Sequence, residues 1–388
     1  MKRRVPHIFS ILLIAVLLVT SILGVSSTLV RNTAESGIQS AVDAEGKETA
    51  VWEEIKKQMA TMMTIEAEAA TNAEKTTENY TATTFFPKVE KFLNTPSLWK
   101  TSEALNNCYI GAKLYCQYLS GLSDFKAFPS YTNPSEILPG DVIQIKGHYL
   151  VCLDVSASGG RISLRTFETN WPNGSYTIGN GIYWVKDNKI HRNGTSQDRP
   201  FVQGWHIISS FYDAAKTCVD TKFYTGMYND IANAIGANYT KLLSHYMEFG
   251  VQEGRTASPS FDIKVYVSQN SDIKSAFGSN YRQAFYHYIT FGIFEKNRKA
   301  SHFYEGSYYL SKYSDLSRAF GSSSKAYIKA AKHFNESGVY EQREAIASFS
   351  VLKYKNFYPD LSAVFSNNWL KYYIHYIQFG IKEGRTAK

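Results

Sequence analysis

The sequence predicts an α+β domain followed by an all-α array of repeats, and two observations lead to this fold class. Between residues 95 and 212, short apolar segments separated by turn signals follow one helical stretch, which is typical of an antiparallel sheet packed on a helix. Between residues 220 and 388, one phrase recurs four times with helical spacing. A chain of 388 residues is long enough for two or more domains of these kinds.

Residues 1–30 are expected to be an export signal or a membrane anchor. A basic tip, KRR, precedes residues 5–30, which contain no Asp, Glu, Lys or Arg. The small residues 25–27 would suit a signal peptidase, but the apolar run is also long enough to span a bilayer, so both interpretations stay open. In either case the rest of the chain is expected to be extracytoplasmic, either secreted or anchored to the cell membrane or wall.

Residues 31–94 are expected to form a short helix and a polar stalk. Their composition is dominated by Ala, Thr and Glu, as in IEAEAATNAEKTTENYTATT. The main apolar segment lies at residues 52–63, and the remainder lacks the apolar stripe that a packed helix needs.

Four copies of one pattern occupy residues 220–388. The phrase HYMEFGVQEGR recurs as HYITFGIFEKNR, HFNESGVYEQR and HYIQFGIKEGR, starting at His245, His287, His333 and His375. In the second copy the apolar positions have the spacing of an amphipathic helix, at Tyr281, Ala284, Phe285, Tyr288 and Ile289. Each copy of about 42–46 residues predicts a helical hairpin that packs against its neighbours, because so short a unit cannot bury its own apolar stripe. The single histidine of each copy predicts a structural hydrogen bond, not a metal site.

Cys108 is the candidate nucleophile. Asn106 and Asn107 precede it and are good N-cap residues, so Cys108 falls in the first turn of a predicted helix, where free amides and the helix dipole favour the thiolate. The same amides could donate to an oxyanion, and Asn107 is a candidate side-chain donor. The other cysteines, Cys116, Cys152 and Cys218, are expected to be buried, and the spacings match no zinc pattern.

His148 is the candidate general base. Of the three histidines in residues 95–212, only His148 stands at the mouth of a strand after a Pro-Gly-Asp turn, whereas His191 and His206 are expected to be surface or core residues. The next strand ends in Glu168 and Asn170, which are two residues apart and therefore predicted to share a face. Either could orient the imidazole, so the order of residues is that of a cysteine hydrolase triad.

The stretches NCYIGAKLY, LPGDVIQIKGHYLVCLDV and FETNW resemble the CHAP family of cysteine- and histidine-dependent amidohydrolases and peptidases. The resemblance implies a papain-like α+β fold and cleavage of amide bonds in peptidoglycan. It also implies Cys108 as nucleophile, His148 as general base and acid, and Glu168 or Asn170 as the orienting group. The chain departs from the family pattern at Asn107, where Gln is frequent, and at Tyr149, where valine is frequent. The repeats resemble tandem modules of other secreted bacterial surface proteins.

The sequence therefore predicts an exported peptidoglycan amidase or endopeptidase whose repeats bind the cell envelope. The formal charge is +8, and residues 223–388 carry 20 Lys and Arg against 13 Asp and Glu. This favours anionic envelope polymers as partners, without nucleic acid, and with membrane contact only through residues 1–30. No cofactor and no metal are expected. Two alternatives remain, namely a non-catalytic surface or adhesion protein with a degenerate hydrolase fold, and a secreted cysteine peptidase acting on protein.

Overall fold

The computed structural model describes residue 77 and residues 80–172, 174–194 and 199–388. The expected export signal or anchor, residues 1–30, and the helix expected at residues 52–63 lie outside this part. Within the described ranges, no helix is both long and apolar enough to cross a membrane. The described chain combines one antiparallel sheet with many short helices, which confirms the mixed α and β composition.

The sheet has seven strands in the order β1-β7-β2-β3-β4-β5-β6, and all neighbours are antiparallel. The strands are β1 Ser130–Tyr131, β2 Val142–Ile145, β3 His148–Ser158, β4 Arg161–Thr169, β5 Tyr176–Lys186, β6 Lys189–Arg192 and β7 Phe201–Trp205. Gly159 and Gly160, with φ of 56° and 74°, join β3 to β4, because a two-residue hairpin turn with both central residues left-handed is best made by glycine. This antiparallel pairing places the start of β3 beside the end of β4.

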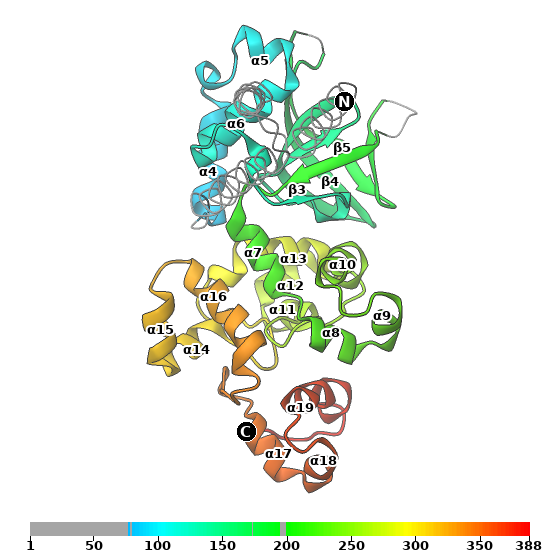
Figure 1. Cartoon of the computed structure of the whole chain (residues 1–388), viewed down its shortest axis with the longest axis vertical. Helices are drawn as coiled ribbons and strands as arrows, with labels where there is room; N and C mark the ends of the chain where they lie inside the picture. The colour runs from blue at the N-terminus through cyan, green and yellow to red at the C-terminus, as the bar shows by residue number, and fades with distance from the viewer. Residues whose placement is uncertain (1–76, 78–79, 173, 195–198) are drawn as a thin grey trace, which may run out of the picture. The chain divides into compact units, whose positions relative to one another are not determined.

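Three helices lie together beside the sheet, namely α4 Ala82–Leu93, α5 Ser102–Asn106 and α6 Cys108–Ser120 (Figure 1). Helix α6 packs on β3 and β4, and α4 packs on α6. In α4, Phe85, Val89 and Phe92 are fully buried at helical spacing. This helix lies in the segment expected to be a stalk, so the core of the sheet region begins before residue 95. Short 3₁₀ turns complete the region at η1 Pro96–Leu98, η2 Phe125–Ala127 and η3 Pro134–Glu136.

Helix α7, Ser209–Thr217, leads into the four repeated segments. Each segment contains three short helices where the spacing predicts a hairpin of two. The segments are α8 Thr221–Met227, α9 Asn229–Ala234 and α10 Tyr239–His245; α11 Ile263–Gln269, α12 Ser271–Phe277 and α13 Tyr281–Thr290; α14 Gly306–Lys312, α15 Ser314–Phe320 and α16 Lys325–His333; α17 Val351–Phe357, α18 Pro359–Phe365 and α19 Trp369–His375.

In every copy, the first helix of the expected hairpin is interrupted at the same position and becomes two short helices. One residue there leaves the helical region, with φ between −115° and −135°, at Tyr228, Asn270, Tyr313 and Tyr358. The next helix then carries an aspartate in its first turn, where a negative charge is favoured by the helix dipole. The last helix of three copies continues into a π-type turn, at η4 Tyr246–Gly250, η6 Phe334–Gly338 and η7 Tyr376–Gly380, and that of the second copy into a 3₁₀ turn, η5 Gly292–Phe294.

The hydrophobic core does not stop at the end of the sheet. One continuous cluster of buried side chains runs from Phe85 through the sheet and the first two helical segments to Ile328. Polar contacts also join the two parts, since the backbone N–H of Ala157 donates to Gln283 Oε1 at 2.7 Å, and Asn133 Nδ2 donates to Glu248 Oε2 at 2.8 Å. The sheet part and the helical segments therefore pack against each other, although a domain boundary was expected between residues 212 and 220.

Candidate active site

Cys108 is the first residue of α6, and the local sequence fixes that position. Asn107 has an extended backbone, and its Oδ1 accepts a hydrogen bond from the N–H of Tyr109 at 3.0 Å, which is an N-cap contact. The helix then approaches β4 closely, because a Cβ on Gly111 would lie 2.1 Å from Thr169 Oγ1. Cys108 is thereby held beside the end of β4.

The structure brings Cys108, His148 and Glu168 together. His148 Nε2 lies 2.7 Å from Glu168 Oε2, and both side chains are buried. The His148 imidazole and the Cys108 thiol are close enough for each to shift the pKa of the other. Since Nε2 is engaged by Glu168, Nδ1 is the ring nitrogen left for the sulfur. The backbone N–H of Tyr149 donates to Cys108 Sγ at 3.4 Å.

The environment shifts the two reacting groups in opposite directions. Burial acts to raise the pKa of Cys108, but the hydrogen bonds from His148 and from the N–H of Tyr149 outweigh it, so the pKa of the thiol lies below its ordinary value. Burial acts to lower the pKa of His148, but its hydrogen bonds to Cys108 and Glu168 raise that pKa to about 9. Both shifts favour a thiolate and imidazolium pair over the neutral thiol and imidazole.

Asn170 makes no hydrogen bond to His148. Strand β4 ends at Thr169, and Asn170 turns the chain with a φ of 59° while its Oδ1 accepts from the N–H of Gly174 at 3.2 Å. Residues two apart share a face only within a strand, and Asn170 lies beyond the end of β4. Glu168 and Asn170 therefore do not point in the same direction. Of the two expected orienting groups, Glu168 is the one placed on the imidazole.

Asn107 is placed as a helix cap. The contact that the structure assigns to its side chain is the one with Tyr109, made through Oδ1. The backbone N–H of Cys108 stands at the first helical position, where no carbonyl of the same helix can accept from it. This N–H is a candidate donor for a developing oxyanion.

Three residues of the site were not indicated by the sequence. Tyr183 Oη donates to Glu168 Oε2 at 3.0 Å, and Arg192 Nε donates to Tyr183 Oη at 3.2 Å. The Arg192 guanidinium lies 4.5 Å from the centre of the Trp171 ring, which is 5.9 Å from the His148 ring. Tyr183 and Arg192 thus form a chain of hydrogen bonds that ends on Glu168, and Trp171 lies between Arg192 and the imidazole ring. For Tyr183 the signal in the sequence is only the strand alternation of GIYWVK, and its contacts join β4, β5 and β6.

The remaining cysteines and histidines of this region have structural surroundings. Burial raises the pKa of Cys116 to about 12, and it raises the pKa of Cys152 and Cys218 well above the ordinary value, so these thiols stay protonated. His206 is buried and lies 3.0 Å from Asp141 Oδ2. His191 is more exposed, and its ring stacks on Trp184 at 5.4 Å.

The histidine that starts each repeated phrase shares one hydrogen bond with a tyrosine of the same copy. The pairs are Tyr224 with His245, Tyr266 with His287, Tyr309 with His333 and Tyr354 with His375, at 2.8 to 3.0 Å. Each copy also joins an arginine to an aspartate and a glutamate, as Arg255 does with Asp230 and Glu253. These contacts agree with the structural role expected for the histidines. In the ranges that the structure describes, no group of three or more possible metal ligands gathers.

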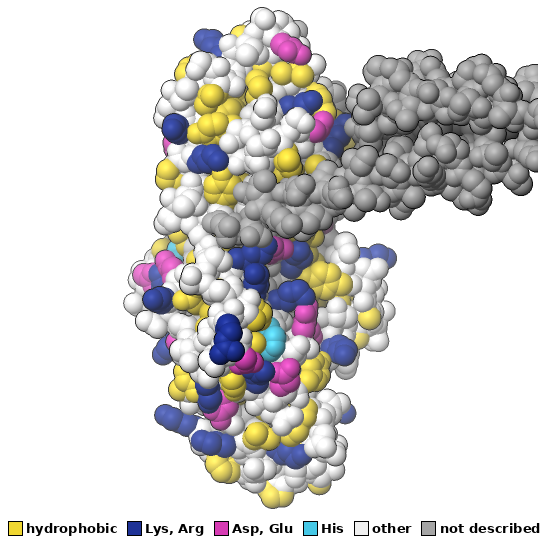
Figure 2. All heavy atoms as spheres, turned by 60° about the vertical axis from the view of Figure 1, so that its left-hand side comes forward, with side chains coloured by type: hydrophobic (Ala, Val, Ile, Leu, Met, Phe, Trp, Pro, Cys, Tyr) yellow, Lys and Arg dark blue, Asp and Glu magenta, His cyan; other side chains and the backbone are white. Residues whose placement is uncertain are grey.

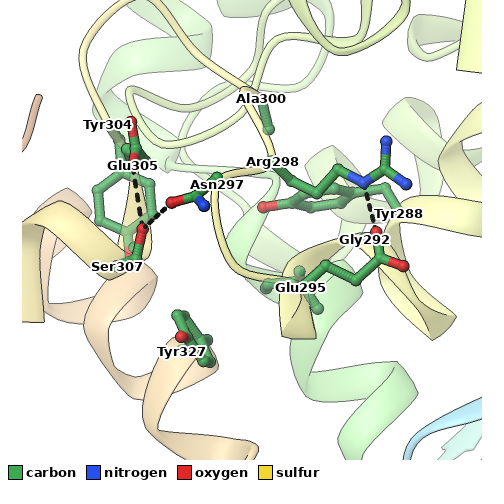
Figure 3. Close-up of a pocket in the computed structure, with 12 residues that line it drawn as sticks. Tyr288, Gly292, Glu295, Asn297, Arg298, Ala300, Tyr304, Glu305, Ser307 and Tyr327 are labelled. Carbon is green, nitrogen blue, oxygen red and sulfur yellow. Dashed lines mark hydrogen bonds and ion pairs between the residues drawn. The ribbon is translucent and has the colours of Figure 1, made fainter. Parts of the chain in front are cut away.

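Basic and acidic side chains are mixed on the helical part of the face shown in Figure 2. A small cavity between the second and third segments is lined by Tyr288, Arg298, Ser307 and Tyr327 among others (Figure 3). Its volume of about 20 Å³ is close to what one water molecule needs. We therefore do not regard it as a site for a ligand.

Comparison of the chain with known protein families, with curated proteins and with solved structures finds no match. The assignment of a function therefore depends on the residues and the geometry described above.

Proposed function

We propose that the protein is an exported cysteine amidohydrolase or peptidase of papain-like fold that cleaves amide bonds in peptidoglycan. The observation that carries this proposal is the contact of Cys108 and Glu168 with the same imidazole, together with the lowered pKa of the thiol and the raised pKa of His148. Perturbed groups of this kind are enriched at functional sites. The resemblance of the surrounding sequence to the CHAP family supports the substrate class.

In the proposed reaction, the Cys108 thiolate attacks the carbonyl carbon of the scissile amide. The carbonyl oxygen becomes an oxyanion, which the N–H of Cys108 can stabilise at the start of α6. The C–N bond then breaks, the imidazolium of His148 gives its proton to the leaving amine, and a thioester remains on Cys108. Neutral His148 next takes a proton from water, the hydroxide adds to the thioester, and the carboxylate product leaves as the thiolate is restored.

Glu168 would act in both steps through His148. Its Oε2 accepts from Nε2 of the ring, so the imidazole keeps one orientation and Nδ1 stays directed at the sulfur. Glu168 is therefore a positioning residue in this scheme, and it also stabilises the charged form of the ring.

The helical segments are proposed to hold the enzyme on the envelope. Residues 223–388 have a net charge of +7, from 20 Lys and Arg against 13 Asp and Glu. Anionic wall polymers would be attracted to such a surface, which would raise the local concentration of the enzyme at its substrate.

The test is digestion of purified peptidoglycan by the full chain and by Cys108→Ser, with mass analysis of the released fragments. We expect new amino and carboxyl ends with the parent chain and none with the variant, because an alcohol is far less ionised than a thiol. Cys116→Ser is the matched control, since the same atom is exchanged at a buried position away from His148.

The same assay separates the alternatives. Fragments from casein but not from peptidoglycan would make the protein a peptidase acting on protein. Absence of turnover on both substrates, with Cys108 no more reactive to iodoacetamide than Cys152, would favour a non-catalytic surface protein.

A further inference from the structure

A second cavity lies far from the catalytic triad. Its volume is about 210 Å³, and it opens where the turn of the β3–β4 hairpin meets the first two helical segments. His148 is at the other end of β3, a strand of 11 residues, so about 30 Å separate this cavity from the nucleophile. The cavity therefore does not belong to the site already described.

Hydrogen bonds between different elements build the walls of this cavity. Asn280 Nδ2 donates to the carbonyl of Ala157 in β3. Gln252 Nε2 donates to the carbonyl of Ser279 at 3.3 Å, and the N–H of Arg282 donates to Gln252 Oε1 at 3.1 Å. Because these contacts join the hairpin to the two helical segments, the cavity is preformed, and a ligand would not have to order it.

Two arginines line the cavity, and no Asp or Glu lines it in the part of the chain that the structure describes. The Nε of Arg161 is buried and has no hydrogen-bond partner in the part of the chain that the structure describes. Its guanidinium is held 3.9 Å from the centre of the Trp184 ring. Arg282 donates to the carbonyls of Met247 and Glu248, which leave its positive charge without a carboxylate.

Four other arginines of the helical repeats differ from Arg161 and Arg282, because they have carboxylate partners. Arg255, Arg298, Arg343 and Arg385 each contact one aspartate and one glutamate. A partly buried guanidinium without an acceptor is unfavourable, and an anion that it can bind in a fork would remove that cost.

We propose that this cavity binds a phosphate group, as a monoester or a diester. The guanidiniums of Arg161 and Arg282 supply the charge, and Ser158 and Ser279 add hydroxyl donors. A Cβ built on Gly159 or Gly160 would meet no atom within 4 Å, so an oxyanion can approach the turn from that side. These four groups of donors come from different sides of the cavity, and the tetrahedral oxygens of a phosphate point in more directions than the two coplanar oxygens of a carboxylate. This site is independent of the proposed hydrolysis.

The test is calorimetric titration of the full chain with inorganic phosphate and with glycerol 3-phosphate. We expect saturable binding, and we expect Arg161→Gln to weaken it about tenfold or more, because a charge-assisted fork is lost. Arg318→Gln is the matched control, since Arg318 is exposed on α15 and the same charge is removed. Arg161→Lys keeps the charge without the fork and should bind with intermediate affinity.

Absence of saturable binding by the parent chain would overturn the proposal, and so would equal affinities of the parent chain and a folded Arg161→Gln. Circular dichroism establishes folding, and if Arg161→Gln does not fold, Arg161→Lys decides in its place. The source of the phosphate is then distinguished by titration with a glycerol phosphate oligomer and with vesicles of phosphatidylglycerol. Hydrolysis by Cys108 is measured separately, so failure of this site and failure of the proposed reaction give different results.

Discussion

Glu168 receives two hydrogen bonds on one oxygen, from His148 at 2.7 Å and from Tyr183 at 3.0 Å. Its other oxygen is buried and has no partner in the described part of the protein. A carboxylate held in this way is committed to the imidazole, while the Asn170 side chain caps a turn. At the level of single residues, Glu168 therefore contacts the imidazole, whereas its neighbour Asn170 stabilises a turn.

The first prediction compares those two residues. Glu168→Gln should lower kcat about 10- to 100-fold, because the amide no longer carries the charge that stabilises the imidazolium. Asn170→Ala should leave kcat within about twofold, since it removes a turn contact and not a contact to the ring. Steady-state kinetics on a soluble muropeptide measure both, and full activity of Glu168→Gln would contradict the assignment.

The second prediction concerns Tyr183 as a positioning residue. Tyr183→Phe removes the hydroxyl that donates to Glu168, so we expect kcat to fall about 5- to 20-fold while KM stays unchanged. Tyr176→Phe removes a hydroxyl from the same strand at an exposed position and serves as the control. Equal kcat values for the two variants would show that Glu168 keeps its place without Tyr183.

The third prediction is a bell-shaped dependence of kcat/KM on pH. As pH falls through the lowered pKa of Cys108, the thiolate is protonated and the nucleophile is lost. As pH rises through the raised pKa of His148, about 9, the imidazolium loses the proton that the leaving amine needs. Activity should therefore be highest between the two pKa values, and a profile still rising above about pH 10 would contradict the ion pair.

At the level of elements, the sequence predicts those parts whose signals are local. The N-cap at Asn107, the Pro-Gly-Asp turn before β2 and the glycines of the β3–β4 turn are each decided by a few neighbouring residues. For this reason Cys108 and His148 could be singled out before their contact was known. The choice between Glu168 and Asn170 could not be made, because it depends on the residue at which β4 ends.

Contacts between elements that are distant in the chain could not be predicted from the sequence. Tyr183 meets Glu168 across two paired strands, and Phe86 of α4 stacks on Phe291 of the second helical segment at 6.2 Å. The break in the first arm of each repeat was also missed. Apolar spacing continues across it, whereas the change of backbone angles at residues such as Tyr228 leaves no apolar signal.

The fourth prediction concerns the glycine that follows the last helix of each repeat. A Cβ on Gly380 would lie 2.3 Å from Tyr354 Oη, and the corresponding distances at Gly250, Gly292 and Gly338 are 2.5, 2.2 and 2.4 Å. Gly380→Ala should therefore destabilise the protein by about 1–3 kcal/mol through overpacking. Urea unfolding measures this, with the exposed Lys382→Ala as control. An unchanged midpoint would mean that the tyrosine can move aside without cost.

At the level of the whole molecule, the fifth prediction concerns attraction to the wall. Binding of Cys108→Ser to isolated walls, which it leaves uncut, should weaken steeply as NaCl rises beyond about 0.15 M, where screening acts within roughly 8 Å. The reason is that the net +7 of residues 223–388 is carried on a surface. Sedimentation with walls at increasing salt measures the effect. Binding that does not change with salt would exclude an electrostatic role for these residues.

Helix α7 connects the sheet to the helical segments, and its residues Ser209, Ser210, Phe211, Ala214, Ala215 and Thr217 are buried. Proteases need an accessible and locally unfolded segment, so this connection is protected in the folded protein. The packing described above also continues on both sides of it. A single proteolytic cut is therefore not expected to separate the sheet part from the helical segments, and the proposed enzyme should lose its hydrolytic and its wall-binding activity at the same rate.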